Sequence, residues 1–255
     1  MLIIPDIHGR TFWKDAVNGR ENEDIIFLGD YLDVYKYEEA FIDKSDNEIF
    51  ESIMENFKEI LDFKKEHKKK VILLLGNHDL SYTCIDKASR YDWLHAGEIY
   101  NIFNSNRELF QMAYEKVIND KRFIFSHAGI SKNWLRGHDL ILKGWTEKNI
   151  VDWANNAYLV KNEHFFSALN DISNYRGGFD WWGSMVWADF QEYLDEEDEL
   201  IGDFQIFGHT QLKDNPFVWN KFADLDCRRA FILNEKGLIT ELDGKILEKT
   251  EKKDD

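Results

Sequence analysis

The sequence predicts an α/β fold in which buried strands and helices alternate along the chain. Three observations support this. Five apolar runs of strand length show no alternation with polar residues, as expected of strands covered on both faces. A polar motif with a nearby glycine follows each run. An amphipathic helix is predicted between the second and third runs. The five runs are residues 2–4, 25–28, 71–75, 123–125 and 205–207.

The motifs that follow the five runs carry imidazole, carboxylate and amide groups. In open α/β sheets the functional groups gather beyond the carboxyl ends of the strands, so these side chains are expected to meet at one edge. Their glycines suit a sharp turn where backbone approaches an ion. The motifs are Asp6-Ile7-His8, Gly29-Asp30-Tyr31-Leu32-Asp33, Gly76-Asn77-His78-Asp79, Ser126-His127-Ala128-Gly129 and Gly208-His209-Thr210.

The clearest predicted helix lies between the second and third runs. Ser45 and Glu48 form the sequence signature of a capping box. Apolar residues then recur at helical spacing from residue 49 to residue 61. A first, shorter helix is expected at residues 12–17, which would complete a strand–helix–strand unit.

The donor set points to metal chemistry. One carboxylate placed to bridge two cations, flanked by three histidines, is what a two-metal hydrolytic site needs. A single such motif is also common in ordinary turns, where Asp, Asn and Gly are frequent. The ordered series of five motifs, four of them with a histidine, therefore carries the prediction.

In this order the motifs resemble those of the calcineurin-like metallophosphoesterases. The similarity is greatest to the branch that holds serine/threonine phosphoprotein phosphatases and symmetrical diadenosine tetraphosphate hydrolases, and it extends from residue 2 to about residue 235. It implies a four-layer αββα sandwich with two mixed sheets and a binuclear metal centre. The metal ligands that it implies are Asp6, His8, Asp30, Asn77, His127 and His209, with Asp30 bridging both ions.

The resemblance also implies the remaining catalytic roles. His78 would protonate the leaving group and Asp33 would orient it, while Asn77 would also contact substrate. From the residues alone, a further metal ligand or a structural turn histidine is the less favoured alternative for His78. The two ions are expected to be Mn²⁺, with Fe, Zn²⁺, Ni²⁺ or Mg²⁺ as alternatives, and to activate water as hydroxide.

Two phosphate-gripping arginines of this branch are missing, because Val34 and Leu75 stand in their places. Arg176, beside two glycines, is the first candidate to replace them, although a plain surface role is equally open. Weaker candidates are Arg10, Arg90, Arg228 and Arg229. Three tryptophans could stack a base or simply belong to the core: Trp181, Trp182 and Trp187.

The chain of 255 residues fits one large domain, predicted at residues 1–247. A largely helical insert is expected at 131–203, and a charged, disordered tail at 248–255. Residues 221–226, 229–233 and 238–242 are predicted to form strands of a closing antiparallel sheet.

Composition restricts the partners and the compartment. The net charge of −16 argues against broad nucleic-acid binding. Two cysteines cannot form a disulfide framework, and no long apolar segment appears, so a reducing cytoplasm without membrane contact is expected.

The predicted activity is hydrolysis of a phosphomonoester or a nucleotide phosphoanhydride. The partner is then a small phosphorylated substrate, with a nucleotide as one option. A phosphodiesterase or nuclease on the same fold, a protein serine/threonine phosphatase and a non-catalytic scaffold are the alternatives. The scaffold is disfavoured because every expected ligand is present.

Overall fold

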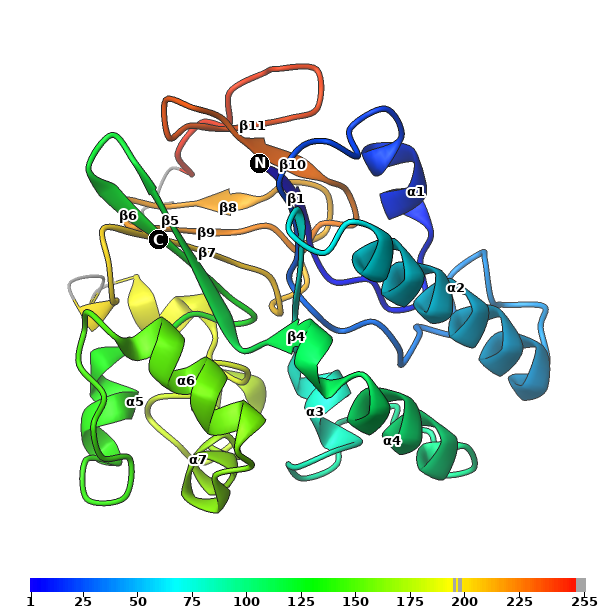
Figure 1. Ribbon diagram of the computed structural model, residues 1–255, viewed down its shortest axis with the longest axis horizontal. Coiled ribbons are helices and arrows are strands. Elements are labelled where there is room, and N and C mark those ends of the chain that lie inside the picture. The colour runs from blue at the N-terminus through cyan, green and yellow to red at the C-terminus, as the bar shows by residue number, and fades with distance from the viewer. Residues whose placement is uncertain (195, 197–198, 251–255) are drawn as a thin grey trace.

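The computed structural model describes residues 1–194, 196 and 199–250. These residues form two sheets packed face to face with helices on the outer sides, a four-layer αββα sandwich (Figure 1). Both sheets are mixed, as the sequence predicted. The first sheet has the order β11-β10-β1-β2-β3-β4 and the second β5-β6-β7-β9-β8.

In the first sheet, three apolar runs become the parallel strands β1 (Leu2–Ile4), β2 (Ile25–Phe27) and β3 (Val71–Leu74). The strand β4 (Phe110–Gln111) extends the parallel part, and β10 (Phe231–Leu233) and β11 (Ile239–Thr240) extend the other side antiparallel.

The second sheet takes the two remaining runs. They lie in the parallel strands β6 (Lys121–Ser126) and β7 (Phe204–Phe207). The hairpin partner β5 (Ala113–Ile118) lies on one side, and β9 (Phe222–Asp224) and β8 (Phe217–Val218) on the other. The prediction that residues 221–226 join one antiparallel sheet with the two later strands is wrong, because β9 is parallel to β7 and lies in the second sheet.

Successive side chains of the central strands point to opposite faces of the first sheet, so this sheet contributes to two hydrophobic cores. Leu2 and Ile4 face the helices, whereas Ile3 faces the second sheet, and β2 and β3 repeat this pattern. Residues 2–4, 25–27 and 71–74 are all buried, which explains why their sequences are uniformly apolar.

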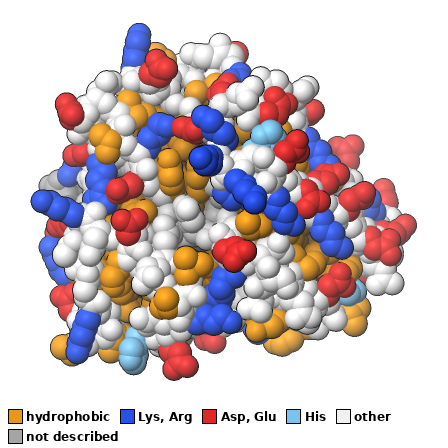
Figure 2. Space-filling model, in the orientation of Figure 1, with side chains coloured by type: hydrophobic (Ala, Val, Ile, Leu, Met, Phe, Trp, Pro, Cys, Tyr) orange, Lys and Arg blue, Asp and Glu red, His pale blue; other side chains and the backbone are white. Residues whose placement is uncertain are grey.

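The outer face of the first sheet is covered by α1 (Phe12–Val17) and α2 (Asp46–Glu66), both at the predicted positions. The capping box of Ser45 and Glu48 is present at the start of α2. After β3 come α3 (Asn77–Ser81), α4 (Ala96–Ser105) and the short 3₁₀ turn η1 (Arg107–Leu109). Figure 2 shows acidic side chains gathered on the side of the molecule that holds α2.

The insert contains α5 (Lys132–Gly137), α6 (Ile150–Leu159) and α7 (Glu163–Ala168), which lie together below β5 and β6 in Figure 1. Two 3₁₀ turns follow, η2 (Asn174–Arg176) and η3 (Phe190–Tyr193), and loops connect these elements.

The predicted tail begins with residues that contact the domain. The backbone N–H of Thr250 donates to the carbonyl of Val218 at 2.7 Å, so the boundary predicted at residue 248 is too early. Residues 251–255 lie outside the described residues. Among the described helices, none is long and apolar enough to cross a bilayer.

Candidate metal centre

The five predicted motifs meet where the two sheets adjoin. β1, β2 and β3 of the first sheet deliver Asp6, His8, Asp30 and Asn77, and β6 and β7 of the second deliver His127 and His209. All six side chains are buried. The motifs converge as predicted, but they come from the edges of two sheets and not from the edge of one sheet.

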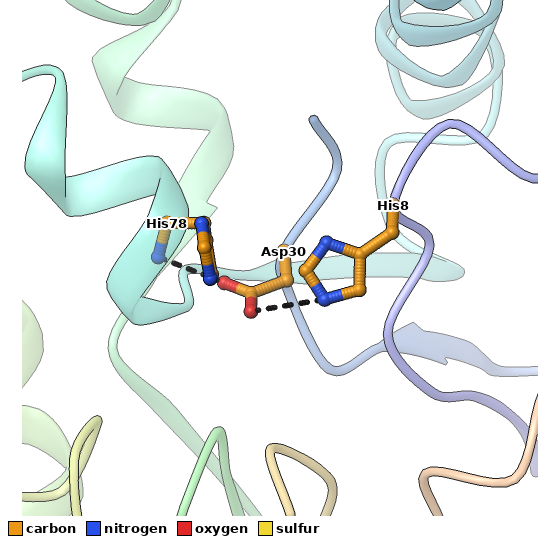
Figure 3. Close-up of side chains that lie close together, drawn as sticks. All are labelled: His8, Asp30 and His78. Atoms are coloured by element: carbon orange, nitrogen blue, oxygen red, sulfur yellow. Dashed lines mark hydrogen bonds and ion pairs between the residues drawn. The ribbon is translucent and has the colours of Figure 1, made fainter. Parts of the chain in front are cut away.

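Two clusters share one carboxylate. His8, Asp30 and His78 form the first, and Asp30, His127 and His209 form the second, with candidate ligand atoms within 4.8 Å of one another in each. Asp30 Oδ2 lies 3.5 Å from the Nε2 atoms of both His8 and His127. Figure 3 shows Asp30 between His8 and His78, with its carboxylate turned to both. Asp30 is therefore shared by both clusters.

The tautomers of two histidines follow from their carbonyl partners. Nδ1 of His8 lies 3.0 Å from the carbonyl of Leu32, and Nδ1 of His127 lies 2.9 Å from that of Leu28. In a neutral ring Nδ1 must then donate, which leaves a lone pair on Nε2. When both rings are neutral, as metal ligation requires, the two Nε2 lone pairs lie on the side of Asp30, an arrangement that suits a divalent cation between them.

The second cluster converges on one point. His127 Nε2 lies 3.0 Å from Asn77 Oδ1 and 3.1 Å from His209 Nδ1. The remaining nitrogen of His209, Nε2, is buried and has no hydrogen-bond partner among the described residues. Two imidazole nitrogens and an amide oxygen gathered beside a carboxylate fit the ligand preferences of Mn²⁺, Fe or Zn²⁺.

The electrostatics of the centre favour positive charge. Burial raises the pKa of Asp30, but His127, His78 and His8 outweigh it and hold that pKa well below its usual range. Burial opposes a charge on His127, yet Asp30 and Asp6 raise its pKa to about 10. Both shifts have one cause: a negative bridging group surrounded by groups able to bear positive charge.

Asp6 lies beside the two clusters rather than in them. Its carboxylate oxygens accept from the backbone N–H of His209 at 3.2 and 3.1 Å. A Cβ on Gly208 would come within 2.1 Å of Asp6 Oδ1, so this glycine allows the close approach. The metal-ligand role of Asp6 stays a prediction.

Left-handed backbone turns aim the side chains. His8, Asp30, Asp33 and His209 have φ angles of 43°, 52°, 57° and 73°. Such angles are uncommon outside glycine, although Asp and His tolerate them better than most residues. Strained backbone of this kind clusters at functional sites, because it projects a side chain sharply out of a strand end.

His78 and Asp33 form a buried pair, as predicted. His78 Nδ1 lies 2.7 Å from Asp33 Oδ2. The other carboxylate oxygen, Oδ1, accepts a hydrogen bond from the Tyr82 hydroxyl, which itself accepts from the N–H of Asp92 at 2.8 Å. Burial raises the pKa of Asp33, and these hydrogen bonds oppose that shift.

Asp79 holds two motifs together. Its carboxylate accepts from the backbone N–H groups of Asp30, Tyr31 and Gly76 at 2.8, 2.9 and 2.9 Å. The motif after β2 and the motif after β3 are thereby locked in register. Such a positioning role explains a third acidic residue at the centre that need not contact a metal.

Arg90, a weaker candidate from the sequence, lies beside the pair formed by His78 and Asp33. Its Nη2 lies 3.2 Å from His78 Nε2, its Nε donates to the carbonyl of Asp33 at 3.0 Å, and its guanidinium stacks 3.8 Å from the centre of the Tyr35 ring. Arg90 lies outside the five motifs. The only sequence signal for its position was Tyr35, an aromatic residue at a place where the phosphatase branch that the motifs resemble has glycine.

Arg176 lies close enough to His209 to affect its pKa, and its Nη1 is 3.6 Å from Asp189 Oδ2. Burial, followed by the charge of Arg176, lowers the pKa of His209. The three tryptophans are dispersed: Trp187 packs edge-on to His209 at 5.7 Å, Trp182 packs on the core, and Trp181 is 81% exposed.

A family model relates this chain to known proteins. No match was found among curated protein sequences. Among solved structures, the fold is similar to a serine/threonine phosphatase from Saccharomyces cerevisiae described as similar to human phosphatase PP5, at 13% identity and a TM-score of 0.46. That match covers 88% of this chain but only 65% of the yeast chain, less than two thirds of its length. The family model for calcineurin-like phosphoesterases matches residues 1–212, so the chain belongs to the calcineurin-like phosphoesterase family.

Proposed function

We propose that this phosphoesterase uses a binuclear metal centre to hydrolyse a small phosphorylated substrate, either a phosphomonoester or a nucleotide phosphoanhydride. The observation that carries the proposal is the pair of buried clusters that share Asp30. Asp6, His8 and Asp30 would hold one ion, and Asp30, Asn77, His127 and His209 the other. When bound, the two ions would lower the pKa of water and neutralise phosphate charge.

The chain's own residues supply the remaining functions. His78 is assigned the role of giving a proton to the departing oxygen, because its Nδ1 contacts the Asp33 carboxylate, which favours the protonated ring. Its Nε2 lies 3.2 Å from Arg90 Nη2, a group that only donates, so Nε2 carries the proton to be given only when Arg90 binds phosphate instead. Asp33 holds the ring, and Tyr82 in turn holds Asp33.

Arg90 is proposed to grip the substrate phosphate in place of the missing arginines. It reaches His78 from outside the motifs and is braced by Tyr35 through a cation–π contact. A planar guanidinium can bind two phosphate oxygens at once. Arg176, near His209, would also contact the substrate.

The proposal predicts metal-dependent turnover. The purified chain, stripped of metal and reloaded with Mn²⁺, should hydrolyse p-nitrophenyl phosphate. A panel of phosphopeptides, dinucleoside polyphosphates, cyclic nucleotides and bis(p-nitrophenyl) phosphate should then rank the substrate classes. Preference for the diester or for cyclic nucleotides would favour a phosphodiesterase. Metal binding without turnover of any of these compounds would contradict the proposal.

A further inference from the structure

A cavity of about 590 Å³ opens beside the metal centre. Its walls are the segment 33–37, the first half of α2 and the segment 82–95. The size is typical of pockets that enclose small organic ligands. Its aromatic lining residues are Tyr35, Tyr37, Phe50, Tyr82, Tyr91 and Trp93.

The cavity borders the pair formed by His78 and Asp33. Asp33, Tyr35, Tyr82 and Arg90 all line it. Asp33 contacts His78 Nδ1 at 2.7 Å, Arg90 contacts His78 Nε2 at 3.2 Å, and the Tyr35 ring packs 5.0 Å from the ring of His8. A group that leaves phosphorus on the side of His78 would therefore enter this cavity.

The walls present flat aromatic surfaces. Tyr82 and Tyr91 stack at 4.4 Å, and Trp93 packs edge-on to Tyr91 at 4.8 Å. At the rim, the side chains of Tyr37 and Trp93 are 63% and 74% exposed. Exposed rings at the mouth of a preformed aromatic pocket can stack on a planar ligand at small conformational cost.

Charge divides the cavity into two parts. The outer charged residues are largely paired with one another, since Lys36 binds Asp46 and His95 binds Asp92. Arg90, at the inner end, contacts the carbonyl oxygen of Asp33 and His78 Nε2, and it forms no ion pair with a carboxylate among the described residues. The cavity thus suits a ligand with an anionic end beside Arg90 and an uncharged, flat remainder.

We propose that this cavity binds the leaving group of the substrate, and that this group is a planar aromatic system of nucleoside size. The inference rests on the proposed function and names the substrate class. In the reaction, the oxygen of water bonds to phosphorus, the bond between phosphorus and the ester oxygen breaks, His78 gives its proton to that oxygen, and the proton released by the water restores the proton on His78. The products are inorganic phosphate and a neutral nucleoside-like alcohol held among the aromatic rings.

Binding is tested first without metal and without turnover. Isothermal titration of the metal-free chain with adenosine should show binding, and titration with ribose should show none. Trp93→Ala and Tyr37→Ala should each weaken adenosine binding by about 5- to 50-fold, the range expected from loss of one stacking partner. Trp181→Ala is the matched control, because Trp181 is equally exposed but lies outside the cavity.

Turnover gives the second arm. Adenosine 5′-monophosphate and ribose 5-phosphate share the same leaving oxygen and differ in the base. With Mn²⁺ the first should be preferred in kcat/KM by about 10-fold or more, and Trp93→Ala should remove most of that preference.

The outcomes separate this inference from the proposed function. Adenosine binding without turnover of any phosphate ester would refute the proposed function and retain the pocket. Turnover of p-nitrophenyl phosphate with no adenosine binding, or with equal use of the two sugar phosphates, would refute the pocket. An equal loss of binding in Trp181→Ala and Trp93→Ala would also overturn it.

Discussion

At the residue scale, the centre depends on pairs in which one group fixes the state of another. The carbonyls of Leu28 and Leu32 select the tautomers of His127 and His8, and those tautomers turn lone pairs toward Asp30. Asp33 does the same for His78. A metal site built in this way can be disturbed by residues that never contact the ions.

His78→Asn is expected to retain metal binding and to lose about 10²–10⁴-fold in kcat on alkyl phosphates, because the departing alkoxide then lacks a proton donor. The loss should be much smaller on p-nitrophenyl phosphate, whose leaving group needs little protonation. Steady-state kinetics on both substrates and metal content would measure this. Equal losses on the two substrates would indicate a binding or structural role.

Arg90→Ala should lower kcat/KM by about 10- to 150-fold, since a charge-assisted bond to phosphate is worth about 1.5–3 kcal/mol. Arg90→Lys should recover only part of this, because an ammonium lacks the planar fork. Inhibition by inorganic phosphate should weaken in parallel. Arg136→Ala, which removes a surface arginine paired with Glu199, is the control. Unchanged phosphate inhibition in Arg90→Ala would reject the role.

The sequence predicted which residues meet at the centre but not how they are held. Each motif was visible because it directly follows an apolar strand. Tyr82 and Arg90 follow no strand and reach the centre through the loop after α3, so no periodicity marks them. Asp79 looks like a turn residue in the sequence, and its three backbone contacts depend on the register of two separate strands.

At the element scale, the start of α2 was predicted from the sequence by the capping box of Ser45 and Glu48. Ser45→Ala should lower the free energy of unfolding by about 1 kcal/mol, because it removes the cap of this 21-residue helix. Urea unfolding followed by circular dichroism measures the change. Ser52→Ala, inside the same helix, is the control and should not destabilise, given the high helix propensity of alanine. No difference between the two variants would contradict a stabilising capping box.

Glu192, in η3, is a buried acid that makes the stability of the fold depend on pH. Burial raises the pKa of Glu192 to about 7. The folded state thus holds this proton more tightly than the unfolded state, and stability falls as pH rises from about 4.5 to 7. The loss attributable to Glu192 is at most about 3 kcal/mol.

Glu192→Gln should remove this part of the pH dependence, because the amide resembles the protonated acid. The difference in unfolding free energy between variant and parent should shift in favour of the variant from pH 5 to pH 7 and stay constant above about pH 8. Urea titrations at several pH values in the presence of a chelator would measure it. A pH-independent difference would show that Glu192 titrates normally.

Strand order was the part of the fold that the sequence could not supply. The runs after His209 were predicted as strands, but the sequence of a short strand does not indicate which strand it pairs with. Phe222 and Ala223 are buried beside β7, whereas Phe231 is buried beside β1, and only tertiary packing separates the two sheets. The insert was expected to be largely helical, but its helices α5, α6 and α7 are short and are separated by turns and loops.

At the scale of the whole molecule, the metal centre joins the two sheets. His8, Asp30 and Asn77 follow strands of the first sheet, and His127 and His209 follow strands of the second. Between the sheets lies an apolar core that includes Ile26, Leu74 and Phe125. The core holds the sheets together without metal, while bound ions would add cross-links at one edge.

Metal removal should therefore lower stability without unfolding the chain. A ligand at about 1,000 times its Kd contributes about 4 kcal/mol, which corresponds to a rise in Tm of about 10 °C for a chain of this size. Thermal unfolding with saturating Mn²⁺ and with a chelator would measure the shift, and near-ultraviolet circular dichroism should show packed aromatic groups in both states.

Asp30→Asn should abolish most of the shift, because a neutral amide is a poor bridge between two cations. The control is Asp224→Asn, because Asp224 is buried like Asp30 but belongs to neither cluster. This variant should retain the shift in Tm. If Mn²⁺ raised the Tm of Asp30→Asn as much as that of the parent, the ions would not be bridged by Asp30 and the two sheets would not be joined in this way.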